Sequence, residues 1–341
     1  MTLSRKLTLL SAVLSLGLFA AGAMIVPQAP VAAGTVSAGV LRVHPPVDAV
    51  QGIVAACKKH PVVIIAEWQH GVRQMGDFYM RLVQDSEFQE TVQDIVIEFA
   101  SRNNQQLLDR YIAGQNIPMR EVSHVWRDTT KPASWESPMY AEWLATIREV
   151  NQRLPLGRRF RVLAADTAID WNRIQTHADW EALGDNNVSF ADVIMSEVIQ
   201  KNRHALVVLG GNHVNKMGTR TGGPNTTTLV EKRYPGSVYT VLHQLESVSS
   251  TDAVLHFSDP LIPTFYDLAG TPLGEKPDKN GVPPIRYTDA LLYVGPPESL
   301  TESVPPKGSL DHDYMKEVDR RSMIEWGELR ARQFLGAAAA K

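Results

Sequence analysis

The sequence has very little cysteine and no strongly basic segment. Cys57 is the only cysteine among 341 residues, so no disulfide can form within the chain, and we expect a small, buried apolar side chain there. The formal net charge is −3, and no basic run is longer than Lys58-Lys59 or Arg158-Arg159. Because nucleic acids and anionic membranes usually bind basic surfaces, we expect neither as the main partner.

The signature motifs of several common enzyme classes are also missing. There is no Gly-x-Ser-x-Gly elbow, which argues against a standard α/β-hydrolase serine, and no His-Glu-x-x-His zinc motif. Neither Gly-x-Gly-x-x-Gly nor a Walker lysine motif is present, so dinucleotide and nucleotide-phosphate sites lack their usual cradle. The composition, 44% hydrophobic and 21% charged, is typical of a globular protein with a large core.

The N-terminal residues resemble an export signal. Arg5 and Lys6 precede an apolar run over residues 7–26, and small residues follow at 20–23 and 31–33. A charged start, an apolar middle and a small-residue cleavage site predict a secretory signal over residues 1–34, and export to the periplasm or the medium. The run is about long enough to cross a bilayer, so an uncleaved anchor is the alternative and would be the protein's contact with the membrane.

Six apolar, β-branched runs predict strands, and the segments between them have helical patterning. The expected strands are residues 62–67, 94–99, 160–166, 205–210, 237–244 and 290–294. The expected helices are residues 74–83, 104–112, 140–151 and 191–202, and a C-terminal brace over 314–335 that packs through Met315, Val318, Met323, Trp326 and Leu329. This alternation predicts an α/β fold: a central, mostly parallel sheet of about six strands with helices on both faces, in a single domain over residues 35–341.

Two stretches do not follow the alternation. Residues 116–138 mix polar and aromatic side chains, among them His124, Trp126 and Trp135, and long segments of this kind are often functional lids. Residues 247–287 contain six prolines and little periodicity, and the sequence assigns them no role.

Acidic, basic and imidazole side chains stand where the predicted strands end. They are Glu67, His70 and Arg73 at the first strand, Glu98 at the second, Asp166 at the third, and His213 after Gly210-Gly211 at the fourth. Ligands of open parallel sheets bind beyond the carboxyl ends of the strands, so these side chains should share one rim. Each residue alone has an ordinary structural role as a cap, ion pair or turn residue. Crowded together, they must shift each other's pKa values or hold a cation, and we therefore expect a functional site.

Two motifs in this set resemble a known family. AEWQHGVR is similar to the first motif of the erythromycin-esterase-like proteins, a strand followed by Glu-x-x-His-Gly-x-Arg, at Glu67, His70, Gly71 and Arg73. GGNH at 210–213 resembles a Gly-x-x-His element of the wider group, which joins these esterases to the ChaN-like haem-binding proteins and the TIKI/TraB-like metalloproteases. VWRDTT, ESPMY, VLAADTAIDW and LLYVGPPESL look closest to a branch of secreted bacterial proteins within that group. The resemblance covers residues from about 62 to 300, and it departs from the family at Ala66, where glycine is usual.

The resemblance implies roles for the rim residues. His70 would be the general base on a water molecule, held in place by Glu67, and Arg73 would face the developing oxyanion. Glu98 and Asp166 would orient water or substrate.

His213 would be a second acid/base or a ligand. In a metal-dependent alternative, Glu67, His70 and His213 bind a divalent ion, Glu98 or Asp166 completes the ligand set, and the ion activates the water.

The sequence thus predicts a secreted hydrolase that cleaves an ester or amide bond in a small molecule or peptide. One alternative is a haem- or metal-binding protein of the ChaN-like group without catalysis, and another is a scaffold whose polar rim only binds a ligand. Haem needs an axial ligand, and Tyr79, Tyr111 and Tyr140 are available but also fit the apolar faces of helices. The density of carboxylates at the rim favours water activation over haem. Macrolide hydrolysis is not expected, because the later histidines of the antibiotic esterases have no clear counterpart.

Overall fold

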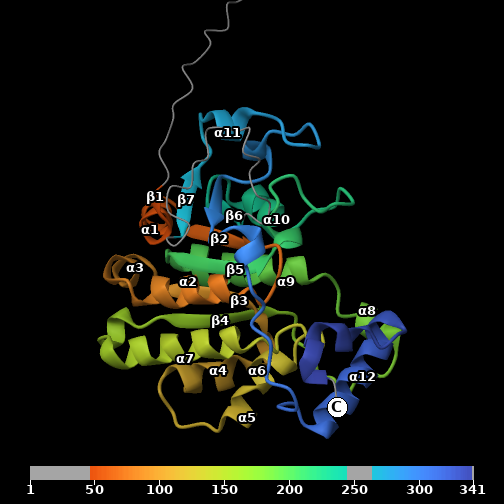
Figure 1. Ribbon diagram of the computed structural model, residues 1–341. Helices are drawn as coiled ribbons and strands as arrows, with labels where there is room; N and C mark the ends of the chain where they lie inside the picture. Colours follow the sequence, from red (N-terminus) through yellow and green to blue (C-terminus); the bar gives the residue numbers. More distant parts are fainter. Residues whose placement is uncertain (1–46, 244–262, 340–341) are drawn as a thin grey trace, which may run out of the picture. The chain divides into compact units, whose positions relative to one another are not determined.

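An eight-stranded sheet organises the part of the chain that the computed structural model describes, residues 47–243 and 263–339. Its order is β1-β7-β8-β6-β2-β5-β3-β4, which Figure 1 shows as a stack from β7 to β4. The strands are β1 Val47–Asp48, β2 Val62–Glu67, β3 Asp94–Ser101, β4 Arg161–Asp166, β5 Ala205–Gly210, β6 Val238–His243, β7 Thr264–Asp267 and β8 Ala290–Tyr293. The strands from β8 to β4 pair in parallel, whereas β7 is antiparallel to both β8 and β1.

The predicted fold class is confirmed, and its six strands correspond to β2, β3, β4, β5, β6 and β8. The expected number of about six strands was too low. The additional strands, β1 and β7, form an antiparallel edge. β7 lies in the proline-containing stretch 247–287, where neighbouring prolines hid a strand of only four residues. The expected signal, residues 1–34, lies outside the described residues.

Helices cover both faces of the sheet. They are α1 Ala49–Lys59, α2 Arg73–Gln84, α3 Ser86–Thr91, α4 Gln105–Ile112, α5 Met119–Val122, α6 His124–Arg127, α7 Pro138–Arg153, α8 His177–Glu181, α9 Asn186–Val193, α10 Thr226–Arg233, α11 Pro272–Glu275 and α12 His312–Trp326. Alternate residues of β2 separate two cores: Val63 and Ile65 pack with α1, α2, α4 and α7, and Ile64 and Ala66 with α9 and α10. Cys57 is buried and free, as expected. No helix in the described ranges is both long and apolar enough to cross a bilayer.

Two predicted helices are interrupted. The brace expected over 314–335 ends at Trp326, because Gly327 has a φ of 71° and terminates α12, and a 3-10 segment, Arg330–Ala339, follows. Met323 and Leu329 are exposed rather than packed, at 48% and 52%. The helix expected over 191–202 is regular only to Val193, where a π-helical turn, Ile194–Val198, begins.

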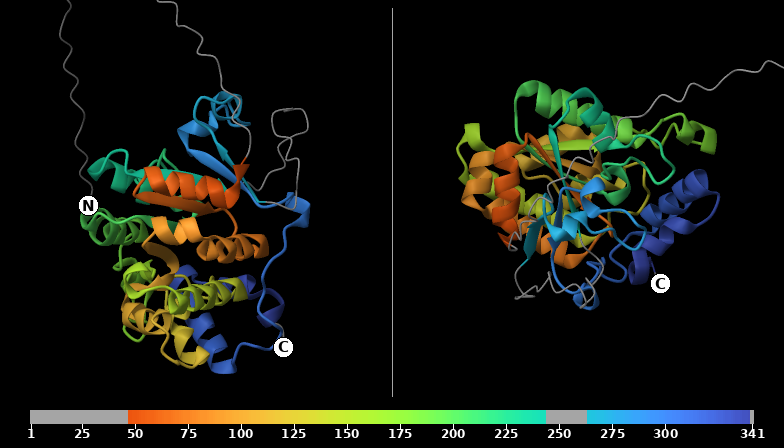
Figure 2. Two further views of the ribbon diagram at one scale, coloured as in Figure 1. Left: turned by 90° about the vertical axis from the view of Figure 1, so that its left-hand side faces the viewer. Right: turned by 90° about the horizontal axis from the view of Figure 1, so that it is seen from above.

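The C-terminal helix α12 nevertheless packs on the chain. It contacts α8, and Figures 1 and 2 show it beside α8 and remote from β7 and α11. Its side chains reach into the stretch 116–138: Arg321 pairs with Asp128 at 3.0 Å and Glu325 with Lys131 at 2.6 Å. This helix therefore fixes the stretch in which the sequence predicted a lid.

Candidate active site

A carboxylate and an imidazole form the centre of the rim. Glu67 ends β2 with only 3% of its surface exposed, and its Oε2 lies 2.9 Å from Nδ1 of His70. The chain makes this contact by turning sharply between β2 and α2. Gly71 has a φ of 78°, a conformation that favours glycine, and its N–H donates to the Tyr140 hydroxyl at 3.2 Å.

Two buried tyrosines complete the surroundings of Glu67. The Tyr79 hydroxyl donates to Oε1 at 2.9 Å, and the Tyr140 hydroxyl donates to Oε2 at 3.0 Å. Burial and the negative charge of Glu67 raise the pKa of both hydroxyls well above 10, so both remain protonated donors. A carboxylate that receives two hydroxyl bonds is held as an acceptor, and His70 must therefore carry its hydrogen on Nδ1. Nε2 of His70 is left with a free lone pair, which is the requirement for a general base.

His70 lies against the neighbouring strand β5. A Cβ placed on Gly210 would be 3.2 Å from both Cε1 and Nε2 of His70 and 3.4 Å from Oε2 of Glu98. Trp135 packs edge-on against the imidazole, with ring centroids 4.5 Å apart. Burial lowers the pKa of His70, but the hydrogen bond and charge of Glu67 and the charge of Glu98 outweigh it, and the pKa lies above 6.5. The side chain is still 34% exposed, so water can reach it.

A second acid–imidazole pair joins Glu98 of β3 to His213, which ends a 3-10 turn directly after β5. Oε1 of Glu98 is 3.5 Å from Nε2 of His213, and Oε2 accepts the Gly210 N–H at 2.5 Å. Burial alone would raise the pKa of Glu98. The charges of His213 and His70, with the hydrogen bonds from His213 and the Gly210 N–H, lower it to about 2. Glu98 is therefore ionised at neutral pH.

Asn187 fixes the orientation of His213. Its Oδ1 accepts the Thr226 N–H at 3.0 Å, which sets the side-chain amide, and lies 2.9 Å from Nδ1 of His213. His213 thus donates from Nδ1 and directs Nε2 at Glu98. Sequence reasoning missed Asn187, and it considered Tyr79 and Tyr140 only as haem ligands, because each belongs to a helix whose packing on the sheet the local pattern does not specify.

Asp166 is buried at the same edge, but both of its carboxylate oxygens are bonded to another segment of the chain. Its two oxygens accept the Thr130 N–H at 2.6 Å and the Thr130 hydroxyl at 2.8 Å. Burial, with a smaller effect from the charge of Glu98, raises its pKa to about 7 against the opposing effect of the Thr130 bonds. Asp166 thereby anchors the stretch that carries Trp135.

Arg73 is not brought into this group. Its guanidinium pairs with Asp77 at 2.8 Å and Glu142 at 2.6 Å, and its side chain is 39% exposed. These two carboxylates raise its pKa further. The described contacts thus place Arg73 in a surface ion-pair network beside the rim.

One further histidine lies at this edge, and the sequence patterns did not predict a role for it. His243 ends β6, and the pairing of Ala66 with Leu242 makes Glu67 its neighbour in the next register position and on the same face. It is fully buried, and neither ring nitrogen has a hydrogen-bond partner among the described residues. Burial lowers its pKa to about 4, so it is neutral at pH 7.

The metal- and haem-dependent alternatives each need suitable ligands. In the described ranges no group of three or more His, Cys, Asp or Glu side chains is arranged to hold a metal ion. The hydroxyls of Tyr79 and Tyr140, considered as haem ligands, are engaged on Glu67.

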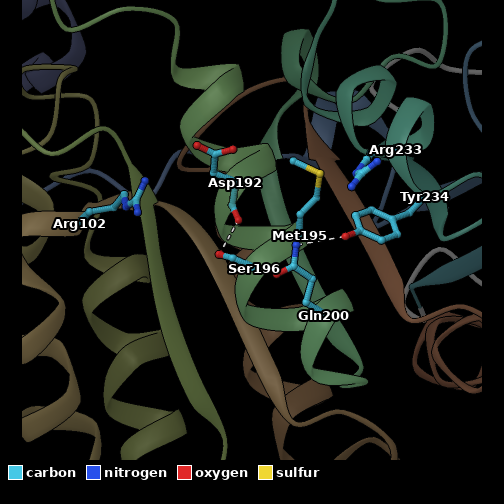
Figure 3. Close-up of a pocket in the computed structure, with 7 residues that line it drawn as sticks. All are labelled: Arg102, Asp192, Met195, Ser196, Gln200, Arg233 and Tyr234. Atoms are coloured by element: carbon cyan, nitrogen blue, oxygen red, sulfur yellow. Dashed lines mark hydrogen bonds between the residues drawn. The ribbon is translucent and has the colours of Figure 1, made fainter.

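A separate surface groove lies elsewhere. Its volume is about 470 Å³, and none of the six predicted site residues lines it (Figure 3). It is lined by Arg102, Asp192, Met195, Ser196, Gln200, Arg233 and Tyr234. The groove follows the π-helical turn after α9 and is distinct from the Glu67–His70 centre.

The architecture matches solved structures. A succinoglycan biosynthesis protein aligns with a TM-score of 0.55 and 10% identity over 74% of this chain and 91% of that one. A Bacillus cereus protein aligns at 0.52 and 12%, over 74% and 92%. The erythromycin esterase EreC, as a histidine-to-asparagine variant in an open conformation, aligns at 0.50 and 11%, over 74% and 94%.

This chain has the erythromycin esterase-like fold. The resemblance expected from the motif at Glu67 is thus confirmed for the fold, which is all that identities this low show. No family model and no curated protein matches the sequence.

Proposed function

We propose that this protein is an exported hydrolase that cleaves esters with a water molecule activated by His70. The observation that carries the proposal is the buried Glu67 carboxylate on Nδ1 of an imidazole that is one-third exposed. A carboxylate in this place fixes the tautomer and stabilises the imidazolium that forms when Nε2 takes a proton. The raised pKa of His70 makes it a stronger base than free imidazole.

The reaction follows from this arrangement. Nε2 of His70 accepts a proton from water as the water oxygen bonds to the ester carbonyl carbon. The carbonyl oxygen becomes an oxyanion, which collapses as the carbon–oxygen bond to the alcohol breaks. The leaving alkoxide takes a proton from His213, and the proton gained by His70 passes through solvent to restore His213, so one water is consumed and an acid and an alcohol are formed.

His213 suits the role of proton donor in this scheme. Its Nδ1 donates to Asn187, and its Nε2 faces ionised Glu98, so a proton on Nε2 makes an imidazolium between two acceptors. A cation held there stabilises negative charge on the reacting oxygen and can protonate the leaving group. Arg73 is not needed for this step, because its guanidinium is committed to Asp77 and Glu142.

The test is turnover of a panel of p-nitrophenyl esters and anilides by the purified protein and by His70→Asn. The account predicts ester hydrolysis by the wild type and a loss of about 10²–10⁴-fold in kcat/KM in the variant. His312→Asn is the matched control, since His312 is an exposed histidine at the start of α12. Circular dichroism establishes that all three proteins fold. Hydrolysis of anilides alone would assign amide bonds instead, and equal turnover by wild type and His70→Asn would refute the proposal.

A further inference from the structure

Trp68 is exposed beside the catalytic pair. It stands between Glu67 and His70 in the chain, and half of its surface, 50%, is open to solvent. A tryptophan so placed presents a large, rigid apolar surface to whatever enters the site.

The indole packs on the backbone of the 3-10 turn that directly follows β5. A Cβ placed on Gly211 would lie 2.9 Å from Cε3 and 3.1 Å from Cδ2 of Trp68. Gly210, the residue before it, is the one against which His70 lies. Gly210 ends β5 and Gly211 follows it, so the imidazole and the indole lie against consecutive backbone positions whose Cα atoms are about 3.8 Å apart. The lack of a side chain at both positions allows this arrangement.

Other apolar side chains are exposed on segments that carry the site. Val188, at 49%, follows Asn187, and Met217, at 54%, is four residues after His213. Together with Trp68 they account for three of the nine large apolar side chains exposed in the described ranges. An exposed apolar side chain beside a polar site is a common part of a ligand-binding surface.

We propose that Trp68 binds an apolar part of the substrate, so that the preferred esters have an extended alkyl or aryl acyl chain. This inference rests on the proposed hydrolase function and specifies its substrate class. Packing of the chain on the exposed part of the indole holds the carbonyl carbon next to His70. Each methylene group that leaves water on binding raises kcat/KM about fourfold.

The experiment compares p-nitrophenyl acetate, butyrate and octanoate as substrates of the wild type, Trp68→Ala and Trp68→Phe. The expected result is a kcat/KM that rises with chain length in the wild type. In Trp68→Ala the ratio of octanoate to acetate falls about tenfold or more, and Trp68→Phe restores most of it. Leu156→Ala is the matched control, because Leu156 is 80% exposed but lies between α7 and β4, and it should keep the wild-type ratio. An unchanged ratio in Trp68→Ala overturns the inference while leaving the hydrolase proposal intact.

A binding measurement separates the two proposals. Octanoate and acetate ions are titrated into wild-type protein and Trp68→Ala with calorimetric detection, and the Trp68 indole N–H of the wild type is also followed by NMR. Binding of octanoate that Trp68→Ala weakens supports the inference even if no ester is hydrolysed, in which case the hydrolase proposal alone fails. Equal, negligible binding of both ions refutes the inference.

Discussion

The imidazole of His70 lies against Gly210, where a Cβ would stand 3.2 Å from Nε2. That distance is shorter than an ordinary van der Waals contact. The atom it reaches, Nε2, is the one that must receive a proton. Gly210 has a φ of −60°, which any residue adopts, so the glycine is required for space rather than for backbone conformation.

Gly210→Ala should therefore keep the fold and impair catalysis. The added methyl group displaces the imidazole by a few tenths of an ångström, and we expect kcat/KM for an ester to fall about tenfold or more. Steady-state kinetics with a thermal melt measures both effects. Gly157→Ala is the control, because nothing lies within 4 Å of a Cβ there. Full activity in Gly210→Ala would show that the ring has no fixed position.

Tyr79→Phe and Tyr140→Phe each remove one donor from the buried Glu67 carboxylate. The free energy of unfolding should fall by about 1–3 kcal/mol in each, because a buried acceptor loses its partner. A carboxylate with fewer hydrogen-bond donors interacts more strongly with the His70 imidazolium, so the pKa of His70 and the acid limb of the pH–rate profile should move to higher pH. Denaturant unfolding and the profile test this together. Tyr111→Phe is the matched control, because Tyr111 is a buried tyrosine that makes no hydrogen bond to Glu67. If the acid limb of the profile stays in place in both variants, the tyrosines do not influence the pKa of His70.

Asp166 should make stability depend on pH. Its pKa is raised to about 7 in the folded protein from 3.8, so its protonated form favours folding, and its contribution is lost as pH rises from about 4 to 7. Relative to Asp166→Asn, the wild type should lose unfolding free energy over this interval, by on the order of 1 kcal/mol or more. Asp179→Asn is the comparison, because its pKa is lowered and its contribution changes only at lower pH. A constant difference between wild type and Asp166→Asn from pH 4 to pH 8 would contradict the raised pKa.

The sequence predicts the rim well, because strand ends follow from apolar runs. Glu67 and Glu98 end or follow such runs, and parallel pairing alone brings their strands to one edge. Arg73 cannot be assigned this way, since its partner Glu142 is on α7 and helix-to-helix packing decides the contact. The same holds for Tyr140, which reaches Glu67 across 73 positions of sequence. β7 was missed because a four-residue strand next to prolines has no readable alternation.

The most direct test of the central claim, that His70 is the base, is to measure its pKa by NMR and compare it with the acid limb of kcat/KM. Its pKa is raised above 6.5, so activity should increase with pH as the imidazolium loses its proton. Glu67→Gln removes the charge that raises this pKa and should lower the NMR value and the kinetic limb together. Coincidence of the two values in wild type and variant is the predicted result. A kinetic limb that stays in place while the His70 titration moves would show that another group activates the water.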